Sequence, residues 1–127
     1  MKVRLIVGTV IFSLLIAVVD QYFKTHLTIT LSNSGSVLGL NVANGLIVIL
    51  HIAVLAGGAA LIAVKVPQLA WKLLGICMLI VSLSNLTDRM LLGGVVDYIY
   101  VLGIWFNLAD TVITLGIILI AYKLIRN

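Results

Sequence analysis

Residues 85–110 read NLTDRMLLGGVVDYIYVLGIWFNLAD and connect two long apolar runs of the chain. The segment contains Asp88, Asp97 and Asp110, three of the four acidic residues in the whole sequence; the fourth is Asp20. A carboxylate at a membrane is costly in free energy, and such residues usually belong to a functional site. We therefore expect the functional site of this chain in residues 85–110.

The composition indicates a polytopic membrane protein. Of the 127 residues, 63% are hydrophobic and 9% are charged, and the mean hydropathy is +1.30. A soluble domain carries about 25% charged residues, so this chain lacks the polar side chains to cover a water-facing surface. Its length suits one compact bundle, and we expect residues 1–127 to form a single integral membrane domain.

The apolar runs predict a mainly α-helical fold, a bundle of four transmembrane helices with a short extracytoplasmic β segment. The expected helices cover residues 3–22, 42–64, 69–88 and 107–125. Residues 25–32 alternate apolar and polar side chains, which predicts a short strand lying on the membrane. The sequence Asn33-Ser34-Gly35 then predicts a turn.

The basic residues predict the orientation of the bundle. With four spans, both termini and the loop at residues 65–72 lie on one side, and this side holds six of the eight Lys and Arg residues. The positive-inside rule places that side, with both termini, in the cytoplasm. All four acids then lie near the outer leaflet. Because the basic residues flank apolar runs, the net charge of +4 does not indicate binding to nucleic acid.

Asp97 and Asp110 are the candidate catalytic residues. Asn107 is a good N-cap with Asp110 three residues later, so ordinary helix capping explains Asp110 taken alone. Asp97 lies on an apolar face of a segment expected to be extended, residues 95–101, and needs a partner there. The link between the two acids is short enough to bring them together. We expect the two carboxyl groups to meet within hydrogen-bonding range on the extracytoplasmic rim.

Two carboxyl groups in one site hold a single proton between them, and such a pair suits amide hydrolysis. The ionised member takes a proton from water while the neutral member protonates the substrate carbonyl oxygen. A helix N-terminus favours negative charge, so we expect Asp110 to be the ionised member. Asp97, on the more apolar face, would then hold the proton.

Other polar residues allow both a structural and a functional interpretation. Asn85, Asp88 and Arg89 have the spacing of one helix face and form a polar corner, or simply a solvated helix end. Asp20 and Lys24 are four residues apart, which indicates either an interfacial ion pair or a contribution to the site. His51 favours a packing role over a proton-handling one. Neither the histidines nor the one cysteine has metal-ligand spacing, so no metal or other cofactor is expected.

Five segments, in this order, resemble the lipoprotein signal peptidase (signal peptidase II) family. They are Asp20-Gln21 with Lys24, Asn33-Ser-Gly35, Asn85-Leu-Thr-Asp88-Arg89, Val95-Val96-Asp97-Tyr98 and Phe106-Asn107-Leu-Ala109-Asp110. The resemblance implies an aspartyl endopeptidase of the bacterial inner membrane that removes signal peptides from diacylglyceryl-modified prolipoproteins. By position, Asp97 and Asp110 match the catalytic pair.

The remaining matched positions imply supporting or substrate-binding roles. They are Asp20, Lys24, Asn33, Gly35, Asn85, Asp88, Arg89, Asn107 and Ala109. Membrane lipids and the lipidated substrate are the expected partners, and we expect a monomer. The chain departs from the family at Ser84, where a glycine is usual, and at Leu38, where an aromatic is common. The segments between Asp20 and Asn33 and between Asp97 and Asn107 are also shorter than usual.

Two alternatives compete with a peptidase. A non-catalytic relative would bind lipidated peptides without cleaving them. A small ion- or proton-handling membrane protein would use intramembrane acids together with His51, and it would spread its acids across the membrane depth. The predicted placement of all four acids on one side favours a hydrolytic site at a membrane surface.

Overall fold

The computed structural model describes residues 1–33, 36–37, 40–41, 44–65 and 68–126. In this part of the chain the helices are α1 (Lys2–His26), α2 (Asn44–Lys65), α3 (Leu69–Leu92) and α4 (Leu108–Arg126). The protein is mainly helical, as the apolar runs predict. The four helices agree in number and approximate place with the four expected.

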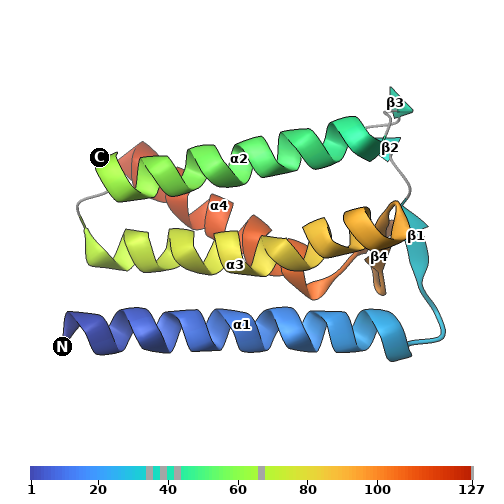
Figure 1. Cartoon of the computed structure of the whole chain (residues 1–127), viewed down its shortest axis with the longest axis horizontal. Helices are drawn as coiled ribbons and strands as arrows, with labels where there is room; N and C mark the ends of the chain where they lie inside the picture. The colour runs from blue at the N-terminus through green and yellow to red at the C-terminus, as the bar shows by residue number, and fades with distance from the viewer. Residues whose placement is uncertain (34–35, 38–39, 42–43, 66–67, 127) are drawn as a thin grey trace.

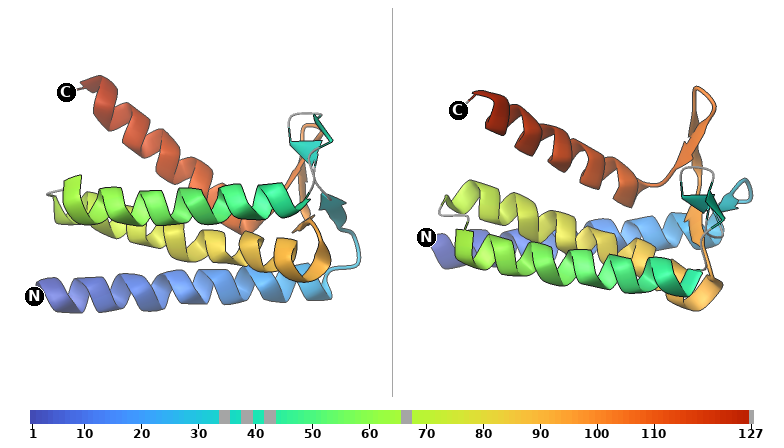
Figure 2. Two further views of the ribbon diagram at one scale, coloured as in Figure 1. Left: turned by 45° about the horizontal axis from the view of Figure 1, so that its top comes forward. Right: turned by 90° about the horizontal axis from the view of Figure 1, so that it is seen from above.

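α3 is the central helix of the bundle because it packs against each of the other three. α1, α2 and α3 run side by side, whereas α4 diverges from them toward its C-terminal end (Figures 1 and 2). Both chain termini lie at one end of the bundle and the strands lie at the other (Figure 1). The side of the membrane on which each end lies stays a prediction.

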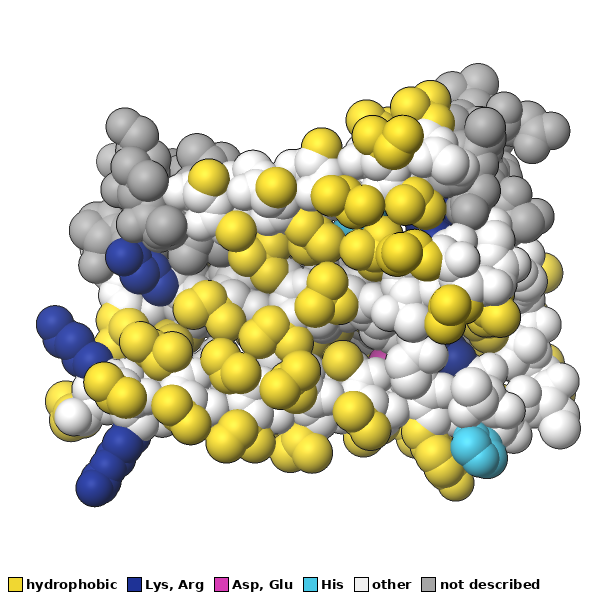
Figure 3. Space-filling view, in the orientation of Figure 1, with side chains coloured by type: hydrophobic (Ala, Val, Ile, Leu, Met, Phe, Trp, Pro, Cys, Tyr) yellow, Lys and Arg dark blue, Asp and Glu magenta, His cyan; other side chains and the backbone are white. Residues whose placement is uncertain are grey.

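The surface of the bundle suits a lipid environment. α1 and α3 are long and apolar enough to cross a membrane, and only 11% and 28% of their most apolar windows are buried in the protein. Within the described side chains of α2, the stretch Gly45–Ala60 is also apolar. Hydrophobic side chains spread over the helices, and Lys and Arg side chains gather at the end that carries the N-terminus (Figure 3). So many exposed apolar residues would be unusual on the surface of a soluble protein.

Short antiparallel strand pairs close the end opposite the termini. Among the described residues β1 (Leu31–Asn33) pairs with β4 (Val95–Asp97), and β2 (Ser36–Val37) with β3 (Leu40–Asn41). The register of the first pair sets Leu31 opposite Asp97. β5 (Ile99–Val101) and β6 (Ile104–Phe106) form a hairpin. This end of the bundle therefore carries Asp97 just before the hairpin and the start of α4 just after it.

The expected strand at residues 25–32 is wrong over most of its length. α1 continues to His26, and β1 begins only at Leu31. The hydroxyl of Thr25 donates to the carbonyl oxygens of Gln21 and Tyr22 at 3.0 Å each, so this β-branched residue is accommodated in the helix. The longer helix brings Lys24 into the interior, where it has buried partners.

The other boundaries shift by smaller amounts. α3 extends past residue 88 to Leu92 and ends at Gly93, whose φ of +76° lies in the left-handed region that glycine adopts without cost. The turn expected at Asn33-Ser34-Gly35 falls partly outside the described residues, since these include the backbone of Asn33 but neither Ser34 nor Gly35. Leu38 is likewise outside them.

Close packing of α3 on α4 depends on Gly116. A Cβ atom at this position would overlap the sulfur of Met78 and lie 2.8 Å from its Cγ. Overpacking costs about 1–3 kcal/mol, and the better helix propensity of alanine returns at most about 1 kcal/mol. We expect Gly116→Ala to lower the free energy of unfolding in detergent micelles by about 1 kcal/mol.

The matched control is Gly57→Ala, because a Cβ there meets no atom within 4 Å. That variant should be as stable as the wild type or slightly more so. Adding Met78→Ala to Gly116→Ala should recover part of the loss. If Gly116→Ala unfolds at the same denaturant concentration as Gly57→Ala, the close contact between α3 and α4 is wrong.

Candidate active site

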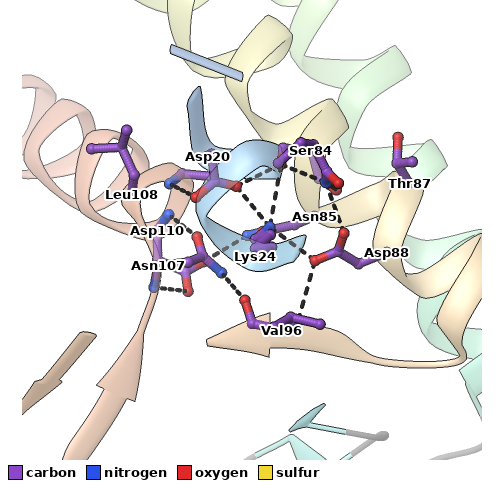
Figure 4. A network of polar contacts seen from close by, with 12 residues as sticks. Asp20, Lys24, Ser84, Asn85, Thr87, Asp88, Val96, Asn107, Leu108 and Asp110 are labelled. Atoms are coloured by element: carbon purple, nitrogen blue, oxygen red, sulfur yellow. Dashed lines mark hydrogen bonds and ion pairs between the residues drawn. The ribbon is translucent and has the colours of Figure 1, made fainter. Parts of the chain in front are cut away.

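The buried interior at the strand end of the bundle is polar rather than apolar. Asp20 and Asn107 are 0% exposed, and Asp88 is 2% exposed. These side chains come from α1, from the residue directly before α4 and from α3, and they converge beside β4 (Figure 4). Buried charges are stable only when they are paired and hydrogen-bonded. Their contacts must therefore account for every charge.

Lys24 forms an ion pair with each of two buried acids. Its ammonium group lies 2.7 Å from a carboxylate oxygen of Asp20 and 2.9 Å from one of Asp88. It also donates to the side-chain oxygen of Asn85 at 2.7 Å and to the hydroxyl of Ser84 at 3.2 Å. The Asp20–Lys24 pair is thus buried in the cluster, which favours a contribution to the site over an interfacial ion pair.

Asn85 connects this cluster to Asp110. Because its side-chain oxygen accepts from Lys24, its nitrogen must face the other way, and it donates to Asp110 Oδ1 at 2.7 Å. Lys24 therefore sets the orientation of the Asn85 amide, and the amide in turn holds the Asp110 carboxyl group. The expected polar corner of Asn85, Asp88 and Arg89 exists, and its first two members are buried.

Asp88 holds the strand that carries Asp97. One oxygen accepts from the side chain of Gln21 at 2.7 Å, and the other accepts from the backbone N–H of Val96 at 3.2 Å. Val96 directly precedes Asp97 in β4. The end of α3 is therefore tied to β4 through a charge-assisted hydrogen bond.

Asn107 contacts both candidate catalytic acids. Its side-chain oxygen accepts from the N–H of Asp110 at 2.9 Å, and its own N–H donates to Asp110 Oδ2 at 3.4 Å. This is a reciprocal capping box at the start of α4. The side-chain nitrogen of Asn107 donates to Asp97 Oδ1 at 2.8 Å. Capping and a site are therefore not alternatives here, because the capping residue itself bonds both acids.

Asp97 and Asp110 open onto one cavity of about 580 Å³ between α2, α3, α4 and the strands. Asn85, Arg89 and His51 also line it, and most of the remaining wall is apolar. The apolar lining residues are Ile47, Leu50, Val54, Val95, Trp105 and Ile113. An apolar cavity with a few convergent polar groups is typical of a binding site for an apolar ligand.

The electrostatics of Asp97 favour its neutral form. Burial, reinforced by the negative charge of Asp110, raises the pKa of Asp97 to about 6, and the hydrogen bond from Asn107 opposes this rise. Burial and the bond to Asp20 also raise the pKa of the Tyr98 phenol, so its hydroxyl stays neutral and can donate. Asp97 is therefore suited to hold a proton at mildly acidic pH.

The structure brings most of the sequence-predicted site residues together. Besides those above, Arg89 lines the cavity, and the buried Ala109 donates its N–H to Asp20 Oδ1 at 3.3 Å. The side chain of Asn33 and the whole of Gly35 are outside the described part of the chain, so the expected roles of these two residues stay predictions. The backbone of Asn33 pairs with Val95 in the strand that carries Asp97.

Four residues of this region were not among the candidate site residues predicted from the sequence. Gln21 and Ser84 bond the buried acids, Tyr98 bonds Asp20, and His51 lines the cavity. Gln21 lies three residues before Lys24 and Ser84 lies four residues before Asp88, so helix spacing could have found these two. Tyr98 and His51 have no comparable local signal.

The family described as Signal peptidase (SPase) II matches residues 4–126 of the chain. The lipoprotein signal peptidase of Burkholderia cenocepacia is 41% identical over 51 residues, which cover 36% of this chain and 31% of that protein. The chain thus aligns with about a third of the length of this curated relative.

Two solved structures, each of a bacterial membrane enzyme determined by the in meso method, have the same fold. The one at 2.3 Å resolution has a TM-score of 0.78 and 24% identity, covering 94% of this chain and 89% of that one. The one at 1.9 Å resolution has a TM-score of 0.74 and 24% identity, covering 99% and 93%. Because the family match spans nearly all of the described helices and strands, this chain belongs to the signal peptidase II family.

Proposed function

We propose that this protein is an aspartic endopeptidase that removes signal peptides from diacylglyceryl-modified prolipoproteins. The observation that carries the proposal is the placement of Asp97 and Asp110 on one apolar-walled cavity, joined through Asn107. Membership of the signal peptidase II family supports the same activity.

The geometry supports different roles for the two acids, one as proton donor and the other as proton acceptor. Asp97 holds the proton and donates it to the oxygen of the scissile carbonyl, while the ionised Asp110 takes a proton from the attacking water. The result is a neutral tetrahedral diol. Asp110 then protonates the departing amine, Asp97 takes back the proton of the diol, and the C–N bond breaks. The pair ends with one proton, as it began, and it titrates as a unit.

The surrounding polar groups favour the anionic form of Asp110 and offset part of the cost of its burial. The side chain of Asn85 donates to one of its oxygens and the N–H of Asn107 donates to the other. Lys24, buried behind Asn85, supplies a positive charge that also favours ionisation. Arg89, on the cavity wall, is in place to contact substrate carbonyl groups.

A substrate anchored by acyl chains suits the position of the cavity. Its wall is mostly apolar, and it lies at the strand end of a bundle whose outer surface is apolar (Figure 3). Basic residues at the opposite end support a cytoplasmic location for both termini. We propose that residues 1–127 act as one monomeric domain in the bacterial inner membrane, with the cavity on the extracytoplasmic side.

The proposal is tested by incubating the purified protein in bilayer mimetics with a prolipoprotein peptide whose cysteine carries diacylglycerol. Mass spectrometry should detect one cut, directly before the lipidated cysteine. The same peptide without lipid is the control and should be cleaved far more slowly. A protein that binds the lipidated peptide but never cleaves it would be the non-catalytic relative, and the peptidase proposal would be abandoned.

The pKa of Asp97 predicts the alkaline side of the pH profile. The neutral form of Asp97 is the active one, and its fraction falls as pH rises through its pKa of about 6. Because kcat/KM reports groups of the free enzyme, kcat/KM should fall as pH rises above about 6. A profile of kcat/KM that stays flat to pH 9 would contradict a proton-donating Asp97.

A further inference from the structure

Tyr98 directly follows Asp97 in sequence and bonds the start of α4, but it is not among the residues that line the cavity. Its backbone N–H donates at 3.1 Å to the carbonyl oxygen of Phe106, which is the residue before Asn107. Its ring packs against Phe23 of α1, with centroids 5.7 Å apart. Tyr98 is therefore fixed both to the strand that carries Asp97 and to α1.

The hydroxyl group of Tyr98 makes two hydrogen bonds of opposite sense. It donates to Asp20 Oδ1 at 2.8 Å, and it accepts from the backbone N–H of Leu108 at 3.1 Å. Asp20 is itself fixed by Lys24 and by the hydroxyl of Ser84. The phenol therefore joins a rigid buried carboxylate to the first turn of α4.

The first turn of α4 is held by three side chains: Asp20 of α1, Tyr98 after β4 and the capping residue Asn107. The N–H groups at the start of a helix have no partner within it and need outside acceptors. Here the N–H of Leu108 is bound by Tyr98, that of Ala109 by Asp20, and that of Asp110 by Asn107. The Tyr98 hydroxyl is the contact that links this turn to the residue next to Asp97.

We propose that Tyr98 is a positioning residue whose hydroxyl sets the separation of Asp97 and Asp110. The proposal rests on the peptidase function above, since it concerns the geometry of that pair. Without the hydroxyl, the N–H of Leu108 loses its acceptor, and the turn that carries Asp110 can move relative to β4. The hydrogen bond from Asn107 to Asp97 spans the same gap and loosens with it.

Tyr98→Phe removes one oxygen atom and keeps the ring contact with Phe23. A small misplacement of reacting groups costs up to about 100-fold in rate, and we expect kcat on the lipidated peptide to fall by about 10-fold. KM should stay within about two-fold of the wild type, because Tyr98 does not line the cavity. Loss of donation from Asn107 should move the alkaline limb of the kcat/KM profile to higher pH.

Tyr100→Phe is the matched control. Tyr100 lies in β5, two residues after Tyr98, and is 58% exposed, and its hydroxyl makes no hydrogen bond within the described residues. Its kcat and pH profile should equal those of the wild type. As a rescue, 3-fluorotyrosine at position 98 retains the hydroxyl and should restore kcat.

Several outcomes would overturn the inference while leaving the peptidase function intact. Tyr98→Phe with unchanged kcat and pH profile would make Tyr98 a purely structural residue, even if the thermal midpoint falls. Failure of 3-fluorotyrosine to restore kcat would remove the role of the hydroxyl. An inactive wild type would instead refute the proposed function itself, so the two failures are distinguishable.

Discussion

Asp97→Asn and Asp110→Asn should each lower kcat for cleavage of the lipidated peptide by a factor on the order of 10⁴, as expected when one member of a catalytic unit is removed. Asp97 supplies the proton for the carbonyl oxygen and Asp110 receives the proton from water, so neither step proceeds without its carboxyl group. Single-turnover cleavage in bilayer mimetics, followed by mass spectrometry, measures the loss.

Asparagine is the stringent replacement because it preserves shape and hydrogen bonding. The new amide oxygen at position 97 can still accept from Asn107, and the one at position 110 can still accept from Asn85. Both variants should therefore fold and bind the uncleaved peptide with near-wild-type affinity. Either variant with more than about a tenth of the wild-type rate would exclude its acid from the chemistry.

Lys24→Met should have the largest effect on stability. The side chain of Lys24 is 2% exposed, and its ammonium group pairs with both Asp20 and Asp88, which are themselves buried. Removing it leaves two buried carboxylates without a cation, and breaking a buried ion pair costs about 3–5 kcal/mol. Reversible unfolding in detergent micelles should detect a loss of this size in the free energy of unfolding.

Two further variants identify the cause of that loss. Lys2→Met removes an exposed lysine from the same helix and should change the stability little. Adding Asp20→Asn and Asp88→Asn to Lys24→Met removes the stranded charges and should recover much of the stability. If Lys24→Met is as stable as Lys2→Met, the buried charge cluster does not exist as described.

The helical part of the fold could be predicted because its signal is local. Apolar runs long enough to span a membrane placed the four helices to within a few residues at most ends. The strand expected at residues 25–32 failed because local alternation competed with a tertiary demand. Extending α1 to His26 buries Lys24 between two acids, and a preference for extended structure at Thr25 and Thr28 does not offset that gain.

In the candidate site, too, contacts between residues close in sequence could be predicted, whereas contacts between distant residues could not. The Asn107–Asp110 capping box is a contact within one turn, so spacing alone predicted it. The position of Asp97 beside it depends on the short link between the acids and on the hydrogen bond from Asn107. The network of Gln21, Ser84 and Tyr98 joins residues more than 60 positions apart, and nothing local indicates such pairings.

Whether Asp97 and Asp110 form one catalytic unit is tested most directly by comparing both single Asn variants with the double variant in the same cleavage assay. When two residues act as a unit, removing the second costs little more activity than removing the first. The kcat of the double variant should therefore be within about ten-fold of that of either single variant. A double variant whose loss equals the product of the two single losses would mean that the acids act independently, and the shared pair would be wrong.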